Sequence, residues 1–175
     1  MYSGALDRLF LCSQGSRKRT LLSRAGALLV ASMNVLKRWL VAHSSVLVRS
    51  RGTPDEVKFF APSSGKSCVR INSKQKSSAQ VIALLHECGH IIVYNRRRRR
   101  PHKRHCGATF REWWCDTGRC SRGSKKRKLA ILHEEIEAWE LGEKLAKKLG
   151  VRYSPRELEL TRTHALLTYT RDCLL

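Results

Sequence analysis

Residues 81–93 read VIALLHECGHIIV, an apolar segment of helical length that carries two histidines four positions apart. An α-helix advances 3.6 residues per turn, so His86 and His90 are expected one turn apart on the same face. Two neutral imidazoles in that arrangement can bind one zinc ion. Glu87 lies off that face, where it can take a proton from a water molecule bound to the ion. The segment therefore predicts a metal-binding helix with a general base beside the metal.

The residues around this segment also favour a helix. Ser77 and Ser78 can cap its N-terminus, and Gly89 leaves space between the two ligands. The alternative interpretation is a surface helix with two solvated histidines. Because the flanking residues are too apolar for a helix that faces water, the metal-binding interpretation is preferred.

A third ligand is needed, because a catalytic zinc ion usually has three protein ligands and one open position. The charged segment HEEIEAWE at residues 133–140 is the obvious source of a carboxylate. Glu135 is expected on the flank of the apolar face of this helix, where a carboxylate needs a partner to offset its lost hydration. Glu135 is therefore the predicted third ligand, and Glu143 is the alternative or a supporting residue.

Helical periodicity divides the rest of this segment into two groups. The apolar face is expected to contain Leu129, Leu132, Ile136, Trp139, Ala146 and Leu149. The remaining glutamates are expected to point toward solvent: Glu134, Glu137 and Glu140.

The chain as a whole predicts a mostly helical α+β protein, with a small sheet packed against the helix at 81–93. The expected elements are one or two helices over 21–43 with a possible break at 32–34, two hairpin strands at 57–60 and 68–71 around a turn at 62–65, a helix over 128–149 closed by Gly150, and a helix that begins at Ser154 and Pro155. Residues 1–20 are expected to form a flexible basic tail. Residues 21–175 are expected to form a single domain with an irregular basic insert at 95–128.

Charge is concentrated in that insert. The chain has a formal net charge of +21, and residues 96–128 contain fourteen lysines or arginines against Glu112 and Asp116. Such a balance predicts attraction to polyanions. The unbroken run Arg96, Arg97, Arg98, Arg99 and Arg100 is the best candidate for contact with nucleic-acid phosphates. The alternative is a basic loop that is simply solvated.

Other residues of the insert leave two further alternatives open. A second, structural zinc site could use the residues His102, His105, Cys106, Cys115 and Cys120, although paired C-x₂-C spacing is absent and unpaired thiols are preferred. Trp113 and Trp114 can stack on bases or can anchor the loop to the domain.

Cysteine count and hydropathy bear on the compartment. Seven cysteines without a regular spacing favour reduced thiols, and therefore a cytoplasmic protein. The longest apolar stretch, at 25–36, is too short for a membrane span, so none is expected.

The segment at 86–90, followed later by EIEAWELG at 135–142, resembles the ImmA/IrrE-like group of gluzincin-type zinc peptidases, and especially small peptidase-like proteins encoded by phages and prophages. The resemblance covers residues 57–149 without the basic insert. It implies a zincin-like fold, the zinc ligands His86, His90 and Glu135, and Glu87 as the general base. It also implies a bacterial host cytoplasm as the location. Gly142 stands where that group more often has alanine.

Two functions of different classes follow. The preferred one is a zinc-dependent metallopeptidase that hydrolyses peptide bonds in a protein or peptide substrate, with the basic insert as a tether to nucleic acid or another polyanion. The alternative is a non-catalytic nucleic-acid-binding or virion-associated protein on a zincin scaffold. The candidates for stabilising the oxyanion, which the sequence does not rank, are Tyr94, His133, Tyr153 and Tyr169.

Overall fold

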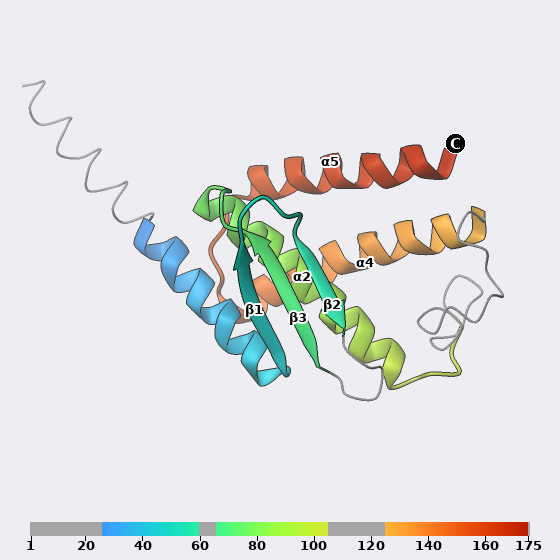
Figure 1. Cartoon of the computed structure of the whole chain (residues 1–175), viewed down its shortest axis with the longest axis horizontal. Helices are drawn as coiled ribbons and strands as arrows, with labels where there is room; N and C mark the ends of the chain where they lie inside the picture. Colours follow the sequence, from blue (N-terminus) through green and yellow to red (C-terminus); the bar gives the residue numbers. More distant parts are fainter. Residues whose placement is uncertain (1–25, 60–65, 105–124, 175) are drawn as a thin grey trace, which may run out of the picture.

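The computed structural model describes residues 26–59, 66–104 and 125–174. In these residues the chain forms a helix at 26–42 followed by β1 (Ser45–Ser50), β2 (Glu56–Phe59), β3 (Ser67–Asn72), α2 (Ser77–Arg98), α4 (Lys125–Leu149) and α5 (Pro155–Leu174) (Figure 1). The expected class is confirmed: the protein is α+β and mostly helical, with a small sheet. The predicted tail at 1–20, the turn at 62–65 and the insert residues at 105–124 lie outside the described residues.

The sheet has three strands in the order β1-β3-β2. β2 pairs with β3 in antiparallel fashion, with Val57 opposite Val69, which confirms the predicted hairpin strands. β1 was not expected, and it pairs with β3 in parallel. Its valines at 46 and 48 are exposed, and Leu47 between them packs against the core, so β1 is covered on one face only.

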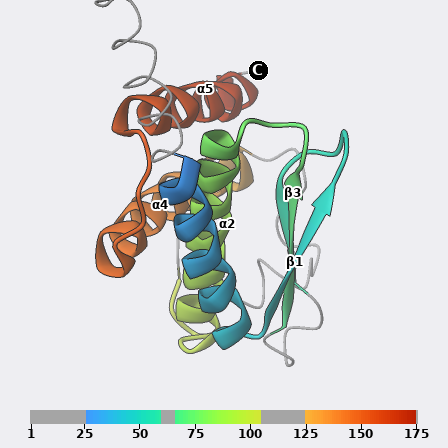
Figure 2. The same cartoon turned by 90° about the vertical axis from the view of Figure 1, so that its left-hand side faces the viewer.

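α2 lies between the sheet and α4, and the helix at 26–42 lies beside α2 on the same side of the sheet (Figure 2). The main core is formed where these elements meet. Its fully buried side chains include Leu36, Leu40, Val69, Ile71, Val81, Leu84 and Leu85. α2 is therefore covered on opposite sides, which explains the many apolar residues of its segment 81–93.

The helix at 26–42 is continuous, so the possible break at 32–34 is not present. Met33 is buried in the core, and the hydroxyl of Ser32 accepts a hydrogen bond of 2.9 Å from the backbone N–H of Arg152. The polar residue that suggested a break instead binds the chain that follows α4.

The ends of the helices agree only in part with expectation. Gly150 has φ +66° after α4, and the hydroxyl of Ser154 accepts a bond of 3.2 Å from the N–H of Glu157, as predicted for these two caps. The prediction that Ser77 or Ser78 caps α2 was wrong, because Lys76 is the N-cap and makes no side-chain capping bond. Gln80 donates instead to the carbonyl of Gln75 at 2.7 Å, which ties the first turn to the preceding loop.

α2 and α4 cross at very short range because each contributes a glycine to the crossing. A Cβ on Gly89 would overlap the backbone carbonyl of Ala138, and a Cβ on Gly142 would overlap that of Leu85. The absence of a side chain at Gly89 therefore allows α4 to approach α2. It does not serve to leave space between the two histidines, as the sequence had suggested. This crossing brings the N-terminal half of α4 against the histidine-bearing face of α2.

Among the described residues, none of the helices combines the length and the apolar character that crossing a membrane requires.

Candidate metal centre

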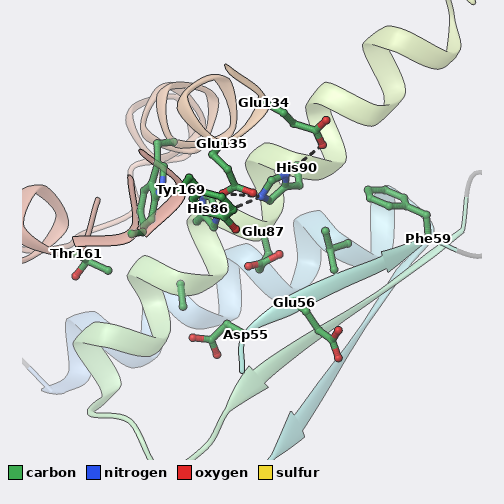
Figure 3. Close-up of a pocket in the computed structure, with 14 residues that line it drawn as sticks. Asp55, Glu56, Phe59, His86, Glu87, His90, Glu134, Glu135, Thr161 and Tyr169 are labelled. Atoms are coloured by element: carbon green, nitrogen blue, oxygen red, sulfur yellow. Dashed lines mark hydrogen bonds and ion pairs between the residues drawn. The ribbon is translucent and has the colours of Figure 1, made fainter. Parts of the chain in front are cut away.

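Three side chains from α2 and α4 converge where the two helices cross. The Nε2 atoms of His86 and His90 lie 3.1 Å apart. Oε2 of Glu135 lies 3.1 Å from Nε2 of His86 and 3.6 Å from Nε2 of His90 (Figure 3). The two histidines and Glu135 thus form a group that could hold a metal ion, as the sequence predicted.

The spacing of these three donor atoms fits a zinc ion. Two ligand atoms at roughly 2.0–2.1 Å from zinc in tetrahedral geometry are separated by about 3.3 Å. The three observed separations, 3.1, 3.1 and 3.6 Å, bracket that value. Two imidazole nitrogens and one carboxylate oxygen also form a donor set common at catalytic zinc sites, which keep a fourth position for water.

Glu143, the alternative third ligand, lies elsewhere on α4. Its carboxylate pairs with Lys147 at 2.9 Å and approaches Arg162 of α5 at 3.9 Å. It is not among the residues that line the cleft at the metal centre. Of the two candidates for the third ligand, Glu135 is therefore the one that lies beside the histidines.

The two histidine rings are held by different neighbours. His86 stacks on Trp139 with ring centroids 4.1 Å apart, and its buried Nδ1 has no hydrogen-bond partner among the described residues. Nδ1 of His90 lies 3.6 Å from Oε1 of Glu134. Aromatic packing thus orients one ring, and a carboxylate lies beside the other.

Electrostatics in the metal-free centre follow from burial and from this close pairing. Burial alone would lower the pKa of His90, but the carboxylates of Glu134 and Glu135 outweigh it and raise the pKa to about 10. Burial lowers the pKa of His86, because the opposing effect of Glu135 is smaller. The pKa of Glu135 is held well below its usual range, since its hydrogen bonds to both histidines outweigh its burial. The centre therefore contains a carboxylate and at least one proton that a metal would displace.

Glu87 lies next to the ligands and is only 4% exposed. Burial raises its pKa to about 7, against the opposing effect of His90. Its carboxylate is directed into the space between α2 and β2 (Figure 3). A carboxyl group that gains and loses a proton near neutral pH is suited to general acid–base chemistry.

These residues form one wall of a cleft of about 450 Å³. β2 and α5 supply the remaining walls, with Glu56, Val57 and Phe59 from β2 and Thr161, Ala165 and Tyr169 from α5. The contribution of α5 was not expected, although the four-residue spacing of 161, 165 and 169 on one helix face is visible in the sequence.

The four candidates for oxyanion stabilisation differ in whether they line the cleft. Tyr169 lines it. Tyr94 is 2% exposed and stacks on Phe59, and His133 is exposed on α4. Tyr153 packs against the main core and against a smaller cluster formed by Ile82, Trp139 and Leu158. Among the described residues, Tyr169 is the one of the four that lines the cleft.

Two expectations about charged residues were wrong. Glu134 and Glu137 do not simply point to solvent, because both carboxylates bind Arg97, at 2.8 and 3.3 Å. Arg97 in turn is buried, in the last turn of an α2 that extends to Arg98 into the segment expected to be irregular. Arg97 is therefore not available for phosphate contact. Glu140 is exposed as predicted and pairs with Lys144.

The rest of the arginine run has a mixed environment. Arg96 is exposed and approaches Glu137 at 3.7 Å, whereas Arg99 and Arg100 are exposed at the end of α2. Of the residues considered for a second zinc site, only His102 is described, and it is exposed.

The candidate metal centre thus consists of two histidines from one helix, a glutamate from the next and a buried carboxyl group beside them. Comparisons with protein-family models, with curated proteins and with solved structures find no match for the chain.

Proposed function

We propose that the protein is a zinc-dependent metallopeptidase with a zincin-like arrangement of its metal-binding helix. The observation that carries the proposal is the convergence of His86, His90 and Glu135 on one wall of a cleft, with Glu87 beside them. In the sequence these residues form an H-E-x-x-H segment and a later glutamate, a pattern of zinc peptidases.

His86, His90 and Glu135 would hold the ion, and the zinc would supply Lewis-acid activation of a water molecule and of the scissile carbonyl group. Glu87 accepts the proton that the water loses and donates it to the departing amine. In the metal-free protein burial raises its pKa to about 7, the direction that favours uptake of a proton from the water. Tyr169, from the opposite wall, is the candidate to donate a hydrogen bond to the oxygen on which negative charge develops.

An edge strand beside the cleft could bind an extended peptide. β2 is an edge strand in the described sheet, since it pairs with β3 alone, and three of its side chains, Glu56, Val57 and Phe59, line the cleft. An edge strand presents backbone donors and acceptors to which an extended chain can pair. A peptide that lay along β2 would pass in front of Glu87.

The substitution Glu87→Gln tests the proposal, because it keeps the size of the side chain and removes its ability to accept a proton. Hydrolysis of an unstructured protein substrate by the zinc-loaded protein should disappear, and the bound zinc should remain. Glu140→Gln is the matched control on an exposed glutamate. Hydrolysis that survives Glu87→Gln would exclude Glu87 as the base.

A second function is favoured by the basic ends of two helices. Arg99 and Arg100 at the end of α2 and Lys125 and Lys126 at the start of α4 are exposed, in a chain with net charge +21. We propose that these two helix ends bind a polyanion such as nucleic acid, either as a tether for the peptidase or as the main activity of a non-catalytic protein. Binding that persists after removal of the metal would be expected in both cases, whereas hydrolysis distinguishes them.

A cytoplasmic location stays a prediction of the cysteine content.

A further inference from the structure

We propose that Arg97 and Glu134 are positioning residues of the metal centre, which act through His90. The inference rests on the proposed function, since it concerns the same zinc site. It assigns a role to a buried ion pair that the catalytic steps do not use.

His90 presents its two ring nitrogens to different partners. Nε2 lies among the donor atoms of the centre, 3.1 Å from His86 and 3.6 Å from Glu135. Nδ1 lies 3.6 Å from Oε1 of Glu134. The ring nitrogen that binds a metal is set by the partner of the other nitrogen. Glu134 therefore favours the orientation in which Nε2 is directed at the metal position.

Arg97 fixes Glu134 in place. The two carboxylate oxygens of Glu134 are divided between partners: Oε2 accepts a bond of 2.8 Å from Nη1 of Arg97, and Oε1 lies beside His90. The side chain of Arg97 is 7% exposed, so it is not screened by water as a surface ion pair would be. Its Nη2 also donates to Glu137 at 3.3 Å, which restricts the rotation of the guanidinium group.

Arg97 and Glu134 come from the same two helices as the metal ligands. Arg97 follows His90 by two helical turns on α2, and Glu134 precedes Glu135 on α4. The ion pair between 97 and 134 therefore joins the same two helices as the metal ligands. It also offsets the repulsion between neighbouring carboxylates near the centre.

His86 provides an internal comparison. Its Nδ1 has no hydrogen-bond partner among the described residues, and its ring is oriented by stacking on Trp139. Removal of the charge at 134 should therefore disturb one ligand and leave the other in place. A centre with one loosened ligand binds zinc more weakly and gives cobalt a different coordination geometry.

The test measures zinc affinity, by competition with a chelator, and the visible absorption of the cobalt-substituted protein. The variants are Glu134→Gln and Arg97→Met, and their controls are Glu140→Gln and Arg162→Met. Glu140 is an exposed glutamate of the same helix, and Arg162 is an arginine that also pairs with glutamates, Glu143 and Glu159, but does not line the cleft.

We expect zinc affinity to fall 10- to 100-fold in both variants, the range found when outer partners of a ligating histidine are removed. The cobalt spectrum should change in both, and Arg97→Lys should partly restore it. If Arg97→Met fails to fold, the result for Glu134→Gln alone tests the inference. That substitution preserves the side-chain volume and one acceptor oxygen, so the protein is expected to fold. Affinity and spectra equal to those of the controls would overturn the inference. A wild-type protein that binds no zinc would overturn the proposed function and this inference with it.

Discussion

Gly89 of α2 lies directly against the backbone carbonyl of Ala138 of α4, so the two helices meet without an intervening side chain. This contact places Glu135, three residues before Ala138, beside His86 and His90. The metal centre therefore depends on a backbone approach as much as on its ligands.

Gly89→Ala should separate the helices. The added methyl group meets backbone, which cannot rotate away, so we expect the free energy of unfolding to fall by about 1–3 kcal/mol. Zinc affinity should fall as well, because Glu135 moves with α4. Chemical denaturation and metal titration measure the two effects. Gly26→Ala is the control, since a Cβ at Gly26 meets nothing within 4 Å; equal behaviour of the two variants would contradict the crossing.

Trp139→Ala should be strongly destabilising. Trp139 is 4% exposed, packs with Ile82 and Leu158, and stacks on His86. Truncation of a buried aromatic residue costs about 3–5 kcal/mol. Leu129→Ala, at a position that is 57% exposed, should change stability by less than about 0.5 kcal/mol. Thermal and denaturant unfolding of the two variants test this difference, and a similar loss in both would contradict the observed burial.

Zinc should stabilise the protein more as the pH rises from 6.5 to 8.5. In the metal-free protein the pKa of His90 is raised to about 10, above its unfolded value of 6.5. The stability that protonated His90 contributes is therefore complete below pH 6.5 and is lost as the pH rises toward 10. Zinc displaces that proton, so its binding becomes easier over the same interval.

The measurement is the melting temperature of zinc-loaded and chelator-treated protein across this pH range. The gap between the two should widen with pH. A gap that narrows would show that no ligand proton competes with the metal.

The exposed end of α2 should govern any binding of polyanions. Replacing Arg99 and Arg100 with glutamine removes two exposed cations. If both contact phosphates, the slope of log affinity against log salt concentration should decrease by about 2. Fluorescence anisotropy with a labelled oligonucleotide measures the slope, with Arg162→Gln as a control distant from this surface. An unchanged slope would exclude this end of α2 as the binding surface.

The candidate metal ligands could be predicted from the sequence. The spacing of His86 and His90 follows from helical periodicity alone, and the position of Glu135 follows from the cost of burying a carboxylate without a partner. The hairpin of β2 and β3 was also visible, because its strands contain runs of β-branched and aromatic residues.

The remaining features depend on how α4 meets α2. The predicted apolar face of α4 included Leu129 and Ile136, which are 57% and 39% exposed. The buried face instead includes Ala138 and Gly142, which occupy the crossing, together with Trp139, Leu141 and Leu145. The pairing of Arg97 with Glu134 was missed for a related reason: the two residues are distant in the sequence, and their charges favour a solvated interpretation until the crossing is known.

The most direct test of the account is the zinc content of purified wild-type protein, His86→Ala, Glu135→Ala and Glu143→Ala by elemental analysis. We predict about one zinc per chain in the wild type and in Glu143→Ala, and little or none in the other two, because a site with three protein ligands loses most of its affinity with one ligand removed. A folded wild-type protein that holds no zinc after reconstitution would contradict the account.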